Sequence, residues 1–459
     1  MNVYDGQRIE AMLTARGLSP TESIADADII ILNTCSVREK ASNKVFSELG
    51  RIRDRKKPDA LFGIVGCVAR ESGADAFRRI PELNFVFGPQ SYHKLPEILE
   101  NPDAKLLNID LSGLEKFDEL NQISNLQSPI SNLAYIPIQE GCDHCCTYCI
   151  VPFTRGRELS RPFDDVMRDV GKAADTGAIE ICFLGQNVNG YKSPKSKVHS
   201  IKSKDFGLWT LDFGLSDLIR ETAKIESIQR IRFTSSYPTE MTDDLIALFG
   251  TEPKLLPFLN MPIQSGSPGV LARMNRPYGL DLYIDIINKL RAARADIQIS
   301  SDFIVGFPGE TDSDFEMTCD VAQKIGYINS YSFKYSRRPH TAAAVMPDQI
   351  PENIKRTRLA ALDEILTENN RRFNESCIGR IMPCLCEGAD KTGRNLIYRT
   401  PYMQQVVVTR SDIGDRRLGN DKGKQKSTNA TDLRSPISNL ANIHITAANK
   451  CSLRGEIVV

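Results

Sequence analysis

The chain has 459 residues, a length that is enough for about three domains of ordinary size. Of these residues, 41% are hydrophobic and 25% are charged. Its 58 Lys and Arg residues equal its 58 Asp and Glu residues, which excludes a histone-like polycation, so a nucleic-acid partner would need a local basic patch. No stretch approaches the roughly 18 consecutive apolar residues of a membrane span, and the N-terminus lacks the basic-then-apolar order of a secretory signal. The sequence therefore predicts a cytoplasmic protein that makes no contact with a membrane.

The first 108 residues alternate strand-like and helical runs. Apolar strands are expected at 24–33 and 61–65, and a helix at 37–55 between them. This alternation predicts an N-terminal doubly wound α/β domain over residues 1–108. Cys35 and Cys67 each follow the carboxyl end of one of these strands, which is where open α/β sheets bind their ligands.

Residues 109–134 are polar and rich in turn-forming residues, which predicts a linker. The heptapeptide SPISNLA occurs at 128–134 and again at 435–441. Two distant copies do not make a solenoid, which needs regular spacing. We interpret the pair as a repetitive insertion in the coding DNA; chance similarity between two low-complexity peptides is the alternative.

The central region, residues 135–370, repeats strand and helix patterns. Strands are expected at 179–184, 228–233, 258–262, 297–305 and 330–335. Helices are expected between them, for example at 164–176, 212–223 and 280–295. Repeated β/α units of this kind predict a full or partial parallel barrel, interrupted by a basic, Ser-rich loop at 192–208.

The last region, residues 373–459, has short β-like runs instead. Strands expected at 382–386, 405–408, 443–447 and 456–459 predict a small C-terminal β-barrel, and residues 409–434 an exposed polar loop. From residue 377 to the end there are 13 Lys or Arg against 7 Asp or Glu, so the basic patch lies in this region.

Four of the twelve cysteines lie within eight residues, at Cys142, Cys145, Cys146 and Cys149. Cys142, Cys146 and Cys149 have the spacing C-x3-C-x2-C. The register that starts at Cys145 reaches Cys149 but then meets Pro152, so it has no third thiol. Three thiolates on one loop hold three irons of a [4Fe–4S] cluster and leave the fourth iron open to chelate a small molecule.

A zinc site is the structural alternative for this loop. Cys142 and Cys145 form a C-x2-C pair beside His144, but no second pair follows at zinc-ribbon spacing. The iron–sulfur interpretation is therefore favoured, and Cys145 is interpreted as a bystander.

The cluster loop continues as CTYCIVPFTRGRELSRP (146–162), and LGQNVNGY (184–191), LNMPIQSGSPGVLARMNRPY (259–278) and SSDFIVGFPGETDSDFEMT (300–318) follow. With these blocks the chain resembles the radical S-adenosylmethionine (SAM) methylthiotransferases along nearly its whole length. The final SLRGEIV (452–458) resembles the end of a TRAM domain, an RNA-binding β-barrel. LGQNVN and SSDFIVGFPGET are typical of the MiaB group, which acts on N6-isopentenyl(dimethylallyl)adenosine.

This resemblance implies addition of a methylthio group to C2 of isopentenyladenosine at position 37 of tRNA, next to the anticodon. It implies two [4Fe–4S] clusters and SAM as cofactors, with Cys142, Cys146 and Cys149 holding the SAM-binding cluster. No catalytic side chain is expected beyond the cluster ligands. SAM or substrate contacts are expected from four residues: Tyr148, Gln186, Asn187 and Gln264.

The second, auxiliary cluster is expected at Cys35 and Cys67. The family's first ligand is the cysteine of a G-C-Q-M-N block, and Met1 to Asp5 match the residues directly after that cysteine. We therefore expect the third ligand to be missing from this chain, because its start was assigned too far downstream or, alternatively, because the product is truncated.

The expected partners are tRNA carrying isopentenyladenosine and a low-potential electron donor such as a flavodoxin or ferredoxin system, and the chain is expected to be a monomer. Two alternatives share the same domain plan: a methylthiotransferase acting on threonylcarbamoyladenosine in tRNA or on ribosomal protein S12. A third is a catalytically impaired RNA-binding iron–sulfur protein that lacks the first cysteine.

Overall fold

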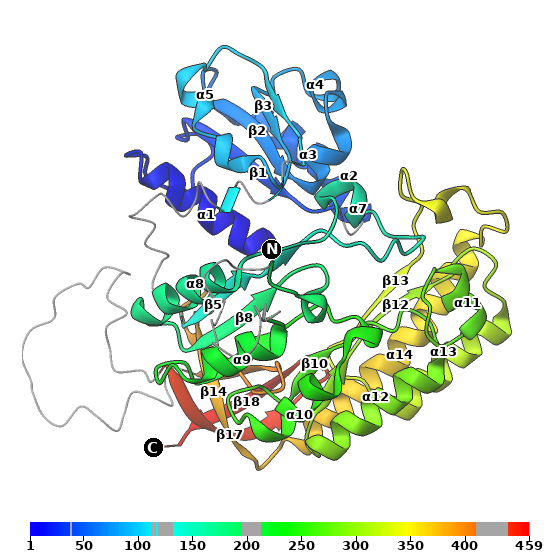
Figure 1. Ribbon diagram of the computed structural model, residues 1–459. Coiled ribbons are helices and arrows are strands. Elements are labelled where there is room, and N and C mark those ends of the chain that lie inside the picture. Colours follow the sequence, from blue (N-terminus) through cyan, green and yellow to red (C-terminus); the bar gives the residue numbers. More distant parts are fainter. Residues whose placement is uncertain are drawn as a thin grey trace, which may run out of the picture.

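The computed structural model describes residues 1–36, 39–111, 113, 116–117, 132–194, 213–409 and 439–458. It contains an N-terminal α/β unit, a central set of parallel strands with helices around them, and a closed C-terminal β-barrel, which confirms the predicted fold class (Figure 1). In Figure 1 the N-terminal unit and the β-barrel lie on opposite sides of the central region. Among the described residues, no helix has the length and apolar character needed to cross a membrane.

The N-terminal sheet is parallel, in the order β1-β2-β3-β4. Its strands are β1 (Ile29–Thr34), β2 (Leu61–Gly66), β3 (Phe85–Phe87) and β4 (Leu106–Asn108). Its helices are α1 (Asn2–Thr14), α2 (Glu39–Arg53), α3 (Cys67–Ser72), α4 (Asp75–Arg79) and α5 (Glu97–Glu100), with a 3-10 turn at Tyr92–Lys94. The first strand begins at Ile29 rather than at residue 24, because Asp26 and Asp28 interrupt the apolar run.

The central region, which we call the core, is built on short parallel strands. One sheet has the order β5-β8-β9, with β5 (Leu133–Pro137), β8 (Glu180–Leu184) and β9 (Arg230–Phe233). Two further parallel pairs are β10 (Phe258–Asn260) with β11 (Gln298–Ser300), and β12 (Asp302–Val305) with β13 (Tyr331–Lys334). The strand expected at 297–305 is therefore two strands, which change neighbours at Ser301.

Helices surround these strands and bury an aliphatic and aromatic core that includes Val170, Ile181, Phe183 and Ile231. They are α8 (Phe163–Asp175), α9 (Leu215–Ala223), α10 (Asp243–Thr251), α11 (Pro268–Arg273), α12 (Leu280–Ala293), α13 (Asp312–Ile325) and α14 (Glu352–Ser376). Three 3-10 turns lie at Val188–Gly190, Pro238–Glu240 and Ala342–Val345. A small hairpin of β6 (Gln139–Glu140) and β7 (Leu159–Ser160) encloses α7 (Val151–Arg155) and the cysteine-rich loop.

The C-terminal strands close into a barrel in the order β14-β15-β16-β18-β17. They are β14 (Ile381–Ala389), β15 (Asn395–Arg399), β16 (Gln405–Thr409), β17 (Leu440–Ala448) and β18 (Ser452–Ile457). The sequence analysis missed β15 and placed the start of the last strand too late. The interior is filled by alternating side chains such as Val406, Val408, Ile443 and Leu453.

Parts of the predicted linker, residues 109–134, belong to the folded protein. Leu133 and Ala134 already belong to β5, and Lys116 and Phe117 are buried. Lys116 forms a buried ion pair with Glu140, which explains how a charged residue of this segment packs inside the protein. Most of the predicted loops at 192–208 and 409–434, and most of both SPISNLA copies, lie outside the described residues.

Candidate functional site

The cysteine-rich loop, residues 141–150, follows the carboxyl end of β5 and leads into α7. Its first residue must be glycine. Gly141 has φ = 75°, and a Cβ atom there would lie 1.9 Å from the carbonyl oxygen of Arg157. Gln139 donates from Nε2 to the Gly141 carbonyl at 2.6 Å, and Gln186 Oε1 accepts from the Gly141 N–H at 2.7 Å. A side chain of β6 and one that follows β8 therefore fix the entry to the loop.

The middle of the loop is fixed from the end of α11. Thr147 donates from its N–H to the Met274 carbonyl at 3.1 Å and from Oγ1 to the Arg273 carbonyl at 2.8 Å. Its own carbonyl accepts from the Ala343 N–H at 2.8 Å. Asn275 donates to the Cys145 carbonyl at 3.1 Å. These contacts hold the backbone that carries the cysteines without using a cysteine side chain.

Cys142, Cys146 and Cys149 are half-buried with free thiols, whereas Cys145 is exposed with φ = 50°. Burial raises the pKa of Cys142 to about 12 and that of Cys149 to about 11, so these thiols are protonated at neutral pH unless a cationic group binds them as thiolates. Among the described residues, no group of three or more His, Cys, Asp or Glu side chains is arranged to hold a single metal ion. A [4Fe–4S] cluster takes one thiolate on each of three irons, and three thiols on one fixed loop suit that group.

Tyr148 is partly buried next to the loop cysteines. Its hydroxyl accepts from Arg276 Nη2 at 3.0 Å, and Arg276 Nη1 donates to the Pro262 carbonyl at 2.9 Å and also bonds the Tyr278 hydroxyl. Burial raises the pKa of Tyr148 well above its ordinary value, so it stays a neutral hydroxyl. Tyr148 is therefore locked in place by a charged group, which suits a side chain that shapes a cofactor pocket.

The structure brings His144, Tyr237 and Glu240, to which the sequence analysis assigned no ligand contact, together with Asn187 beside the loop. The ring of His144 stacks on Tyr237, with centroids 3.6 Å apart and planes 6° apart. Its Nε2 lies 3.1 Å from Glu240 Oε1 and 3.3 Å from Asn187 Nδ2. Only proximity in the fold reveals this group, because its members come from the loop and from the ends of β8 and β9.

Three polar atoms of this group are buried and, among the described residues, have no hydrogen-bond partner: Asn187 Oδ1, Tyr237 OH and Glu240 Oε2. Buried polar atoms normally have partners, so atoms of this kind beside the loop are suited to meet polar groups of a bound molecule. Asn187 is thus placed where the sequence analysis expected a contact, while its Nδ2 is occupied by Glu158 at 3.0 Å.

The other two residues expected to contact SAM or substrate, Gln186 and Gln264, make contacts within the protein. Gln186 lies at the loop, but its side-chain oxygen is used to hold Gly141. Gln264 has φ = 73° and forms an isolated parallel bridge with Phe303, so its backbone joins the β10–β11 and β12–β13 pairs. Its side chain is 8% exposed. For neither residue do these contacts show a role in binding a ligand.

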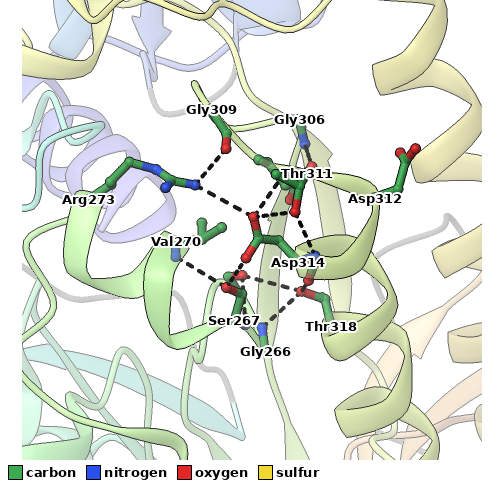
Figure 2. A network of polar contacts seen from close by, with 12 residues as sticks. Gly266, Ser267, Val270, Arg273, Gly306, Gly309, Thr311, Asp312, Asp314 and Thr318 are labelled. Carbon is green, nitrogen blue, oxygen red and sulfur yellow. Dashed lines mark hydrogen bonds and ion pairs between the residues drawn. The ribbon is translucent and has the colours of Figure 1, made fainter.

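Asp314 joins α11 to α13 through a network of polar contacts (Figure 2). Its carboxylate accepts from Ser267 Oγ at 2.5 Å and from the Thr311 N–H at 2.9 Å, and lies 3.8 Å from Arg273 Nη2. Ser267 and Thr311 are the N-caps of α11 and α13. Because Arg273 supplies the carbonyl that binds Thr147, this network positions the cysteine-rich loop.

Cys35 and Cys67 directly follow the carboxyl ends of β1 and β2 in the N-terminal sheet. The register pairs Thr34 with Gly66, so the two cysteines follow paired residues on neighbouring strands. Thr34 Oγ1 donates to the Val65 carbonyl at 2.6 Å and ties the strand ends together. Two thiols are fewer than the three that the resemblance implies, so these residues do not by themselves complete a second cluster site, which stays a prediction.

Arg155, at the end of α7, connects these strand ends to the cysteine-rich loop. It ion-pairs with Asp5 at 3.2 Å and with Glu140 at 3.3 Å. Burial works against its charge, but Cys67, Asp5 and Glu140 together raise its pKa, so the guanidinium stays charged. The N-terminal unit and the core are thus joined through a buried charge network beside Cys67.

Comparison with known proteins agrees with this arrangement. Residues 136–322 match the radical SAM superfamily, and residues 1–88 match the uncharacterized protein family UPF0004. A tRNA-2-methylthio-N(6)-dimethylallyladenosine synthase from Rickettsia felis is 43% identical over 470 residues, covering 100% of this chain and 97% of that protein. Those from Rickettsia bellii and Rickettsia typhi are 47% and 46% identical over 89% of this chain.

The chain belongs to the tRNA-2-methylthio-N(6)-dimethylallyladenosine synthase family. Membership of this synthase family confirms the predicted enzyme class, a radical SAM methylthiotransferase, and its cofactors, [4Fe–4S] clusters and SAM. The roles of individual residues in the cysteine-rich loop remain predictions that rest on the contacts described above.

Proposed function

We propose that this protein adds a methylthio group to C2 of N6-isopentenyladenosine at position 37 of tRNA. The observation that carries the proposal is the fixed loop with Cys142, Cys146 and Cys149, in a chain that aligns over its full length with synthases named for this product. An aromatic C–H bond is too inert for acid–base catalysis by side chains. When bound, the cluster and SAM supply the radical chemistry that this step needs.

The chain's own residues bind and orient the cofactors and the substrate. Cys142, Cys146 and Cys149 would hold the cluster, and Arg276 fixes Tyr148 beside the cysteine-rich loop. Asn187 offers its unpartnered buried oxygen to a donor group of SAM or substrate. The neighbouring aromatic rings, including the stacked His144, restrict the access of water to the loop.

We assign one task to each unit. Residues 1–108 carry Cys35 and Cys67 for an auxiliary cluster, residues 135–370 perform the radical chemistry, and residues 373–459 bind RNA. The net positive charge of the last region supports RNA binding, since phosphate contacts dominate affinity for nucleic acids. The protein works as a cytoplasmic monomer and receives electrons from a low-potential donor of the flavodoxin or ferredoxin kind.

Nucleoside mass spectrometry of tRNA tests the function. A methylthiotransferase-deficient host that expresses this chain should accumulate 2-methylthio-isopentenyladenosine, whereas a host that expresses Cys146→Ala should keep the unmodified isopentenyladenosine. A methylthio group on threonylcarbamoyladenosine or on ribosomal protein S12, with isopentenyladenosine unchanged, would overturn the proposal and favour one of the alternative substrates.

A further inference from the structure

A cavity of about 770 Å³ lies where the core, α14 and the β-barrel meet. This size falls in the range of ligand pockets. Core strands supply one wall, α14 a second and the β-barrel a third. The lining residues that matter below are Asn260, Asp302, Tyr331, Thr367, Asn370 and Lys450.

The walls of this junction cavity are held together by side-chain amides of the core that bond backbone carbonyls of the barrel. Asn329 donates to the Tyr402 carbonyl at 3.2 Å, and Asn370 donates to the Lys450 carbonyl at 2.6 Å. Such bonds depend on the barrel backbone and leave its side chains available to a ligand. The junction cavity is therefore formed before any ligand binds.

The junction cavity is separate from the cysteine-rich loop. No residue of 139–150 lines it. Its core wall comes from strands β9 to β13 and adjoining residues, among them Thr234 and Asn260. The loop instead follows the carboxyl end of β5. A nucleotide that reacts at the loop does not occupy this cavity at the same time, so a ligand here is a different part of the substrate or a different molecule.

The lining combines the three kinds of group that bind single-stranded RNA. Tyr331 is 54% exposed and offers an aromatic face for stacking. Asn260 has a side-chain amide that suits a base edge. Lys450, exposed on the barrel wall, suits a phosphate.

The charged residues of the lining also favour one orientation of the ligand in the cavity. The acidic lining residues, Asp302 and Asp363, belong to the core and α14. Of the basic lining residues, Arg399 and Lys450 belong to the barrel, and Arg232 of β9 is paired with the buried Glu180 at 2.5 Å. Arg399 shares its charge with Glu387 at 2.6 Å, so Lys450 is the main attraction for an anion. A ligand with a phosphate at one end and a base at the other fits this separation, with its phosphate toward the barrel.

We propose that the junction cavity binds one unpaired nucleotide of the RNA substrate, a nucleotide other than the modified adenosine. Its base stacks on Tyr331, and its phosphate contacts Lys450. The inference rests on the proposed function, because it takes RNA as the substrate. It adds a second anchoring point, which orients the RNA loop so that the modified adenosine reaches the cysteine-rich loop.

Fluorescence anisotropy with an anticodon stem-loop RNA tests this proposal on the full chain. Tyr331→Ala should weaken binding by roughly 5- to 150-fold, the usual effect of removing one stacking platform. Thr367→Trp, at an exposed helix position that lines the cavity, should weaken binding by filling the space. Glu364→Trp is the matched control, since it is exposed on the same helix but does not line the cavity.

RNAs with one abasic site at each unpaired position identify the bound nucleotide. Wild-type protein should lose affinity at one position other than the modified adenosine, and Tyr331→Ala should be insensitive to that same abasic site. Folded Tyr331→Ala and Thr367→Trp variants that bind the RNA as tightly as wild type would overturn the cavity assignment and leave the proposed function intact. Wild-type protein that binds the stem-loop no better than a duplex of unrelated sequence would instead contradict the RNA substrate itself.

Discussion

The guanidinium of Arg230, at the start of core strand β9, donates to the carbonyl oxygen of Thr400 in the β-barrel at 3.0 Å. It also reaches the carbonyls of Arg399 at 3.0 Å and Pro383 at 3.3 Å, and its Nε lies 2.7 Å from Glu180 Oε2. One buried side chain thus joins the barrel to the core and is neutralised by a core carboxylate.

We predict that Arg230→Gln destabilises the protein by about 3–5 kcal/mol, because it breaks a buried ion pair and leaves barrel carbonyls without their donor. Equilibrium denaturation measures the loss, and amide exchange should show faster opening in β14 and β15. Arg220→Gln is the control: Arg220 pairs with Asp244 on the surface, where an ion pair contributes about 0–1 kcal/mol. Equal losses for both variants would contradict the proposed role of Arg230.

Gly141→Ala should abolish iron binding at the cysteine-rich loop. The added Cβ would overlap the Arg157 carbonyl, and the positive φ disfavours any other residue. Iron and sulfide analysis after anaerobic reconstitution measures the effect. Gly171→Ala, in α8, meets nothing within 4 Å and should bind iron normally, with a small gain in helix stability. Normal iron content in Gly141→Ala would show that the loop entry can move.

Asp314→Ala should reduce SAM affinity and iron occupancy, with a stability loss of about 1–2 kcal/mol from the lost helix caps. The reason is that Asp314 positions α11, whose last residues hold the loop through Thr147. Isothermal titration with SAM after reconstitution measures the affinity. Asp320→Ala, on an exposed position of the same helix, should match wild type. Unchanged SAM affinity in Asp314→Ala would limit Asp314 to a role in stability.

Cys146→Ala and Cys145→Ala distinguish the two registers of the cysteine motif. Cys146→Ala should lose the visible absorption of the cluster, because Cys146 belongs to the complete triplet. Cys145→Ala should keep the absorption, because Cys145 is exposed and lies outside that triplet. The opposite result would show that the cluster uses the other register.

Several features of the fold could be predicted from the sequence because they depend on local patterns. Apolar periodicity indicated the α/β units and the C-terminal barrel. The β-barrel strand Asn395–Arg399 was missed, since its polar ends hide a short apolar centre. The break at Ser301 was also missed, because it results from a change of strand neighbours, which an apolar run does not record.

The sequence by itself determined the chemistry: the spacing of Cys142, Cys146 and Cys149 along one loop is a local property, and the blocks around it indicate the family. Only the tertiary structure decided how that loop is held, with His144 stacked on Tyr237 and Thr147 bound to the end of α11. It alone revealed the Arg230 junction and the cavity beside it. These features join residues far apart in the chain, and their energies depend on burial and distance, which the order of residues does not record.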